Sequence, residues 1–365
     1  MKVRAAVLVQ VGGPIEVQEL DLQGPQKGEV LVRVLAVGVC HSDWHLVTGD
    51  TQHPLPVVLG HEGAGVIEEV GANVEGLTSG DLVSLNWAPN CGACFYCTHG
   101  RPSLCAEYVG PIWQGTMIDG TTRYTRNGQP VYHYSALACF AERCVVPSVC
   151  CVKMPRDISP EIAAVIGCAV TTGVGSVLNT AKLEAGSSVL VIGAGGVGLS
   201  TVMGAVHAKA RKVIVCDPLE SRRRSAKNLG VDTAFEVTDP EQIKNHTEGR
   251  GADYVFECVG TPELQELAVQ CARPGGTIVF SGLAPSGSAT NIPGARLVRE
   301  EKTVMGSYYG TADTARDFPK YAKMFQDGEL PLDKLVSHRY SLDQINEAYQ
   351  DMLTGKSTRG VVVFD

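Results

Sequence analysis

The chain of 365 residues exceeds the length at which one hydrophobic core keeps growing, so two domains are expected. Hydrophobic residues make up 44% and charged residues 19% of the sequence, which is typical of an ordinary globular protein with ample core. The formal net charge of −8 argues against a polyanionic macromolecule as partner, whether nucleic acid or acidic lipid, and favours small-molecule ligands.

Residues 1 to about 155 are rich in Val, Gly and Pro and contain short alternating runs, such as 29–37 and 65–70. Alternation bounded by turn residues predicts a β-rich, barrel-like domain that starts with the opening strand MKVRAAVLVQ. This opening lacks the pattern of a secretion signal, and the thirteen cysteines are an odd number. The sequence therefore predicts free thiols in a reducing compartment, the cytoplasm.

Three residues that can ligate a metal are spread over residues 40–168: Cys40, His61 and Cys168. Two thiolates and one imidazole would leave a fourth position open, which is the composition of a catalytic rather than a structural zinc site. Spacing alone does not show that the three residues meet. A lone buried cysteine such as Cys168 is usually a small hydrophobic residue.

A compact motif places four cysteines within fifteen residues, among glycines and prolines: Cys91, Cys94, Cys97 and Cys105. A small irregular lobe buries too little apolar surface to be stable, whereas a four-cysteine zinc site contributes folding free energy directly. The spacing predicts a structural zinc lobe over about 89–106. The alternatives are a disulfide cluster or a zinc ribbon on nucleic acid, although only His99 and Arg101 offer positive charge there.

Two uncharged windows, 162–181 and 187–208, are long enough to span a bilayer. Each contains several glycines together with Thr, Ser or Asn, and a glycine-rich turn interrupts the second. This pattern predicts buried core elements instead.

From about Ala169, predicted strands alternate with predicted helices. The strands lie at 188–192, 212–216, 253–259 and 276–281, and helices include 219–229 and 262–272. Such alternation predicts a doubly wound α/β fold, with a parallel sheet covered on both faces. After Tyr309 one polar helix and a strand at 360–364 are expected to return to the first domain. The predicted domains are 1–169, 170–308 and 309–365.

A glycine-rich turn follows the first of these strands and opens a helix; it consists of Gly193, Ala194, Gly195, Gly196, Val197 and Gly198. Such a turn lets the backbone approach a pyrophosphate at a helix N-terminus. Asp217 ends the next strand, nineteen residues after Gly198, where a carboxylate would bind the ribose hydroxyls and favour NAD. The alternatives are NADP, held by Arg222, Arg223 and Arg224, or a tight turn without a ligand.

Together these motifs resemble those of zinc-dependent alcohol dehydrogenases of the medium-chain dehydrogenase/reductase superfamily. The segment GHEGAG at 60–65, the lobe, the glycine turn and the terminal Lys356-Ser-Thr-Arg359 fall in the family's order along essentially the whole chain. The stretch 113–123 resembles the longer, animal and plant type of enzyme. The resemblance implies a GroES-like catalytic domain, a Rossmann NAD-binding domain, NAD as cofactor, and one catalytic and one structural zinc ion.

The resemblance also implies roles around the metal. Cys40, His61 and Cys168 become ligands of the catalytic zinc, with Glu62 nearby as an occasional alternative ligand. Asp43 becomes the carboxylate that orients His61.

For proton and cofactor handling, the resemblance makes Ser42 and His45 the relay that carries the alcohol proton to the surface. The alternatives are that Ser42 only caps a helix beginning after Cys40 and that His45 is an ordinary surface histidine. The positions of His41 and Arg359 match contacts to the pyrophosphate, and that of Arg222 matches a contact to the adenosine ribose.

The implied reaction is reversible hydride transfer from a zinc-bound primary or aromatic alcohol to NAD, which gives the aldehyde. Trp87 matches a large side chain of the inner substrate pocket, which predicts an apolar, narrow channel. Ile112, Trp113 and Leu283 are weaker candidates for its outer wall.

Two other functions stay open from the sequence. One is a thiol-dependent formaldehyde dehydrogenase that acts on an S-hydroxymethyl thiol adduct, although glutathione-dependent members carry an arginine where this chain has Val109. The other is a non-catalytic protein that binds NAD or zinc. A homodimer is expected, with a tetramer as the alternative.

Overall fold

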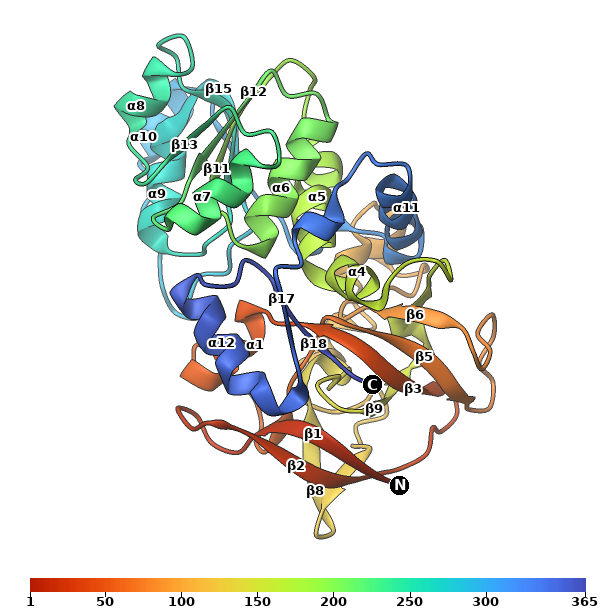
Figure 1. Ribbon diagram of the computed structural model, residues 1–365. Coiled ribbons are helices and arrows are strands. Elements are labelled where there is room, and N and C mark those ends of the chain that lie inside the picture. Colours follow the sequence, from red (N-terminus) through yellow and green to blue (C-terminus); the bar gives the residue numbers. More distant parts are fainter. The chain divides into compact units, whose positions relative to one another are not determined.

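The computed structural model describes residues 1–365 apart from the side chain of Pro111. The chain forms two compact units. Unit 1 comprises Met1–Cys168, Asp313–Gln326 and Val336–Asp365, and unit 2 comprises Ala169–Ala312 and Asp327–Leu335. Figure 1 labels the main elements of both units.

Unit 1 is mainly β-structure. Its strands are β1 (Lys2–Leu8), β2 (Ile15–Leu22), β3 (Glu29–Gly38), β4 (Val57–Val58), β5 (Gly63–Val70), β6 (Leu82–Leu85), β7 (Tyr124–Arg126), β8 (Gln129–His133), β9 (Arg143–Pro147), β10 (Cys151–Lys153), β17 (His338–Tyr340) and β18 (Gly360–Val363). A closed barrel has the order β1-β2-β7-β8-β4, and a second sheet has the order β10-β6-β5-β3-β18-β17, with β9 also paired to β3. The barrel-like domain predicted from the alternating runs is confirmed.

Short helices connect these strands. They are α1 (His41–Thr48), α2 (Phe95–Thr98), η1 (Pro102–Leu104), α3 (Val109–Ile112), η2 (Tyr134–Ala136), η3 (Ser148–Cys150), α4 (Pro160–Val165), α11 (Thr314–Gln326), η8 (Leu342–Gln344) and α12 (Ile345–Thr354). The tail thus holds two α-helices where the sequence predicted one. Its strand β18 pairs with β3, with Val362 opposite Val37, and joins the edge strand β17 to the sheet (Figure 1).

Unit 2 contains a parallel sheet with the order β13-β12-β11-β14-β15-β16. Its strands are β11 (Ser188–Ile192), β12 (Lys212–Cys216), β13 (Thr233–Phe235), β14 (Ala252–Glu257), β15 (Ala272–Phe280) and β16 (Thr303–Gly306). Its helices are α5 (Thr171–Gly175), η5 (Ser176–Ala181), α6 (Gly196–His207), α7 (Glu220–Lys227), α8 (Pro240–Asn245), α9 (Pro262–Cys271), α10 (Gly294–Arg299), η6 (Tyr309–Thr311) and η7 (Leu332–Lys334). The predicted doubly wound α/β fold is confirmed.

The local sequence explains where the elements of unit 2 begin and end. The side chain of Thr261 accepts a hydrogen bond from the Leu264 amide and caps α9, which has Pro262 in its first turn. Strand β14 stops at Glu257, two residues earlier than predicted, because the Glu257 carboxylate accepts hydrogen bonds from Val259 N at 2.7 Å and Gly260 N at 2.8 Å. A turn therefore replaces the end of the strand.

One segment, Pro160–Ala181, is long and apolar enough to cross a membrane by length and composition, but 89% of its 18-residue window is buried inside the protein. It includes the π-helical turn η4 (Ile166–Val170). The second uncharged window is the strand β11, the glycine turn and the helix α6. Both windows are therefore core elements, as the sequence predicts.

Candidate functional site

The predicted catalytic ligands meet in unit 1. Cys40, His61, Glu62 and Cys168 each offer one donor atom, and these atoms all lie within 4.8 Å of one another. Cys40 precedes α1, His61 and Glu62 lie between β4 and β5, and Cys168 lies in η4. All four are buried, with at most 6% of each residue exposed. Residues more than a hundred positions apart thus form one cluster.

A close backbone approach brings Cys168 to this cluster. A side chain at Gly167 would place its Cβ 2.8 Å from the carbonyl oxygen of Leu85, so only glycine lets η4 lie this close to β6. The sequence showed the Gly-Cys pair but not the contact that makes the glycine necessary.

Asp43 orients the imidazole of His61. Its Oδ2 lies 3.0 Å from His61 Nδ1, and its Oδ1 accepts a hydrogen bond of 2.7 Å from the Gly60 amide. The other ring nitrogen, His61 Nε2, is buried and has no hydrogen-bond partner among the described residues. A buried nitrogen of this kind, held from behind by a carboxylate, is the usual arrangement of a metal ligand.

The donor groups of the cluster shift one another's pKa values. A hydrogen bond with Cys168 is the largest cause that lowers the pKa of Cys40 well below its ordinary value. The same pairing raises the pKa of Cys168 well above it. Burial acts to lower the pKa of His61, but the charges of Asp43 and Cys40 override burial and raise it to about 10. Two thiols and an imidazole crowded without solvent are suited to a divalent metal, which favours the deprotonated ligands.

Glu62 is paired with Arg359 in unit 1. The Arg359 Nε donates to Glu62 Oε1 at 3.2 Å, its Nη2 contacts Oε2, and both residues are buried. The structure thus places Arg359, predicted to contact pyrophosphate, against the carboxylate of the metal cluster. Breaking such a buried pair is costly, because it leaves one charge without a partner.

The relay candidates lie on α1. The Cys40 thiol donates to Ser42 Oγ at 3.7 Å, and His45 Nδ1 lies 3.3 Å from Asp50 Oδ2. The cap of α1 is Cys40, which makes no side-chain capping hydrogen bond, so the alternative that Ser42 only caps this helix is wrong. Asp50 is a partner of His45 that sequence reasoning missed.

Aromatic rings surround the metal cluster. The Trp87 ring lies 6.4 Å from that of His61 and 6.1 Å from that of Trp113. Tyr134, which the sequence did not single out, lies 5.4 Å from His61 and 5.9 Å from Trp113. Its hydroxyl donates to the Ser42 carbonyl oxygen at 3.1 Å. Ile112 is buried in unit 1, whereas Leu283 is 64% exposed in unit 2.

The second cluster is the predicted lobe. The sulfur atoms of Cys94 and Cys97 lie 3.5 Å apart, those of Cys91 and Cys97 3.9 Å, and those of Cys94 and Cys105 4.0 Å. Zinc–sulfur bonds of about 2.3 Å would make the edges of a tetrahedron about 3.8 Å long. The four cysteines therefore fit zinc, and all thirteen cysteines of the chain are free thiols.

The glycine turn lies in unit 2 between β11 and α6. A Cβ on Gly198 would lie 1.8 Å from the Gly193 carbonyl oxygen, so the helix packs on the strand only with glycine there. A Cβ on Gly195 would meet nothing within 4 Å, which leaves that face open to a ligand. Gly196 and Val197 start α6, so their amides are among the free donors of its N-terminus.

Asp217 directly follows β12 and is 2% exposed. Its Oδ2 accepts a hydrogen bond of 2.8 Å from the Ala194 amide of the glycine turn and lies 3.8 Å from Arg222 Nη1. Arg223, which reasoning from the sequence placed only with a possible phosphate, donates to the Asp217 carbonyl oxygen at 2.7 Å. The Asp217 carboxylate is therefore held against the glycine turn by a direct hydrogen bond. His41 is exposed at the first position of α1.

Comparison with known proteins agrees with this arrangement. The alcohol dehydrogenase GroES-like domain family matches residues 26–156, and the zinc-binding dehydrogenase family matches residues 196–327. A putative alcohol dehydrogenase D of Mycobacterium tuberculosis is 40% identical over the full length of both chains. An S-(hydroxymethyl)glutathione dehydrogenase of Synechocystis is 39% identical, over 99% of this chain and 100% of its own length.

Among solved structures, benzyl alcohol dehydrogenase from Acinetobacter calcoaceticus has a TM-score of 0.94 and 32% identity, and the match covers both chains completely. An NDMA-dependent alcohol dehydrogenase of Amycolatopsis methanolica is 40% identical over 100% of this chain and 99% of its own length. The chain therefore belongs to the zinc-dependent alcohol dehydrogenases of the medium-chain dehydrogenase/reductase superfamily.

Proposed function

We propose that this enzyme oxidises aromatic or other primary alcohols to aldehydes with NAD. The observation that carries the proposal is the buried cluster of Cys40, His61 and Cys168, whose donor atoms lie within 4.8 Å of one another beside the Trp87 and Tyr134 rings. The aromatic rings offer apolar surface and edge contacts to a benzylic ring. The structurally similar benzyl alcohol dehydrogenase supports this substrate class.

The residues of unit 1 would divide the work. When bound by Cys40, His61 and Cys168, zinc supplies Lewis acidity that lowers the pKa of an alcohol hydroxyl. Asp43 holds the His61 ring in place from behind. Ser42 and His45, both on α1, are the residues that would carry the hydroxyl proton to solvent, and Asp50 Oδ2 lies 3.3 Å from His45 Nδ1.

The residues of unit 2 would bind the cofactor. The amides at the start of α6 would bind the pyrophosphate, and the open face at Gly195 would permit its close approach. The buried Asp217 would repel a 2′-phosphate, so NAD is the expected cofactor, with Arg222 beside the adenosine ribose.

The test of this proposal is NAD reduction with benzyl alcohol, ethanol and a secondary alcohol, each repeated with NADP. Benzyl alcohol with NAD should give the highest kcat/KM. Preference for the secondary alcohol would contradict the proposed aromatic pocket, and preference for NADP would contradict the role of Asp217. Each assay is also repeated with NDMA added, since one relative is named an NDMA-dependent alcohol dehydrogenase.

A second candidate is the oxidation of a thiol adduct of formaldehyde. Relatives named S-(hydroxymethyl)glutathione dehydrogenase, at 39% identity, favour it. Val109, where glutathione-dependent members carry arginine, argues against glutathione as the thiol. Turnover of formaldehyde only in the presence of a low-molecular-weight thiol would select this candidate. Any hydride transfer to NAD rules out the non-catalytic alternative.

We also propose a homodimer in the cytoplasm. Strand β16 is the edge strand of the sheet in unit 2, and its edge groups can pair with those of a second copy. The thirteen free thiols suit a reducing compartment. Light scattering should give twice the 38.7 kDa of one chain, and a fourfold mass would select the tetramer.

A further inference from the structure

A pocket of about 710 Å³ lies within unit 2, away from the glycine turn. Two of its walls are the first residues of β14 and β15, that is, the amino ends of parallel strands. The glycine turn and Asp217 follow the carboxyl ends of β11 and β12. The pocket therefore lies at the amino ends of the parallel strands, whereas the cofactor turn lies at their carboxyl ends.

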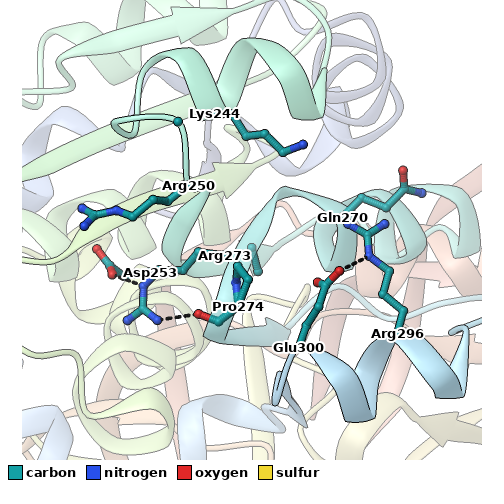
Figure 2. A pocket seen from close by; sticks show the side chains of 10 residues that line it. Lys244, Arg250, Asp253, Gln270, Arg273, Pro274, Arg296 and Glu300 are labelled. Atoms are coloured by element: carbon teal, nitrogen blue, oxygen red, sulfur yellow. Dashed lines mark hydrogen bonds and ion pairs between the residues drawn. The ribbon is translucent and has the colours of Figure 1, made fainter.

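Four cations and two carboxylates line this pocket: Lys244, Arg250, Arg273, Arg296, Asp253 and Glu300. Figure 2 shows two guanidinium–carboxylate pairs on opposite sides of it, Arg273 with Asp253 and Arg296 with Glu300. The chain as a whole carries a net charge of −8. Cations thus outnumber carboxylates by two among the lining residues, and one of these cations, Arg250, is paired with Glu248 outside the lining at 2.6 Å.

The carboxylate of Asp253 is fully engaged in holding the sheet. Its Oδ2 accepts from Ser188 N at 2.7 Å and Ser188 Oγ at 2.6 Å, and its Oδ1 accepts from Arg273 Nε at 2.5 Å. Although burial acts to raise the pKa of Asp253, these hydrogen bonds outweigh it and lower the pKa below its ordinary value. This acid adds little free acceptor capacity to the pocket.

Glu300 is engaged in the same way, between two cations. Its Oε1 lies 2.8 Å from Arg296 Nε, and its Oε2 lies 2.5 Å from Lys302 Nζ. The side chain of Lys302 is 0% exposed and also donates to the Val269 carbonyl oxygen at 2.8 Å. The buried Lys302 thus neutralises Glu300 and leaves the charge of Arg296 for another anion.

Several N–H donors of the pocket have no hydrogen-bond partner in the described part of the chain, whereas its two carboxylates are already bonded. Arg296 uses Nε for Glu300, and its two terminal nitrogens have no hydrogen-bond partner among the described residues. Arg273 keeps its Nη2 after bonding Asp253 and the Pro274 carbonyl oxygen. Lys244 has only Glu241, whose side chain is 75% exposed and whose attraction is screened by solvent.

We propose that this pocket binds a small polyanion with at least two carboxylate or phosphoryl groups, one at the free nitrogens of Arg296 and one toward Arg273 and Lys244. Guanidinium groups with unused N–H donors bind such oxygens strongly and directionally. The site lies at the amino ends of the strands and the cofactor turn at their carboxyl ends, so the ligand binds while NADH is present. The proposal does not depend on which alcohol the enzyme oxidises.

Isothermal titration calorimetry of the enzyme saturated with NADH tests it, with citrate and pyrophosphate as probes. NADH keeps pyrophosphate from the glycine turn, and the tighter of the two probes identifies the carboxylate or phosphoryl class. Arg296→Gln should weaken binding about tenfold, as expected for loss of a charge-assisted pair. Arg299→Gln is the matched control, because it removes the same charge from the same helix at an exposed position outside the pocket.

Lys244→Gln is a second variant, since it leaves the Glu300 pair intact, and it should also weaken binding. Saturable binding that is lost in both pocket variants and retained in Arg299→Gln establishes the site. Failure of both probes to bind, or an equal loss in the control variant, would overturn the proposal.

Discussion

The two cysteine clusters of unit 1 use similar donor atoms in opposite surroundings. Cys40, His61 and Cys168 come from distant elements and are almost wholly buried, and Asp43 and Glu62 surround them. The lobe cysteines lie within fifteen residues, and only Cys105 is buried. The comparison indicates that packing of the surrounding elements holds the first cluster together before a metal binds. The second cluster, in contrast, needs a bound metal to keep its lobe folded.

Contacts around the lobe support this difference. Phe95 is 67%, Tyr96 42% and Leu104 39% exposed, so the lobe has little apolar core of its own. The amides of Ala93 and Cys94 donate to the Cys91 sulfur at 3.4 and 3.3 Å. Backbone donors of this kind stabilise thiolates, and they lower the pKa of Cys91.

The largest expected effect is on turnover, through the buried cluster. Cys168→Ser should lower kcat by more than about 100-fold, because it removes a ligand from the reacting centre. NADH binding, measured by fluorescence, should stay within about twofold. Cys144→Ser replaces a buried thiol outside both clusters and serves as the control. Loss of NADH binding together with turnover would contradict separate roles for the two units.

Loss of a cysteine from the lobe should lower the stability of the protein. Cys97→Ser should lower the free energy of unfolding by about 3 kcal/mol or more, since a four-cysteine zinc site supplies folding free energy. The measurement is thermal unfolding with and without a chelator; the chelator should destabilise the natural chain more than the variant, which has only the buried ion to lose. Cys151→Ser, outside both clusters, is the control. A variant as stable as the natural chain would show that the lobe needs no metal.

A smaller effect is expected at the residue that holds His61. Asp43→Asn should weaken zinc affinity about 10- to 100-fold at the buried cluster, because the imidazole loses its charged partner at 3.0 Å. Competition with a zinc indicator measures this loss, and only one of the two metal sites should change. Equal weakening at both sites would point to general unfolding.

The smallest effect is expected on the surface of the lobe. Phe95→Ala should change the free energy of unfolding by no more than about 0.5 kcal/mol, because the ring is 67% exposed and stacks only on its neighbours. Denaturant unfolding checks this value. A loss comparable to that of Cys97→Ser would mean that apolar packing, rather than the thiols, holds the lobe.

The sequence predicted most of this fold because its signals are local. The strands 188–192 and 212–216 are found where their apolar runs stand, and the lobe cysteines are close because they are neighbours in sequence. Tyr134, Asp50 and the contact of Arg359 with Glu62 were missed, because they depend on tertiary contacts with no mark in the local pattern. The pocket opposite the glycine turn was missed for the same reason.

Zinc content by native mass spectrometry tests the central claim most directly. The natural chain should carry two zinc ions, Cys168→Ser one, and Cys97→Ser one, with the lobe ion retained in the first variant and the buried ion in the second. One ion in the natural chain, or two ions in the Cys168→Ser variant, would contradict the assignment of Cys40, His61 and Cys168 to a single metal.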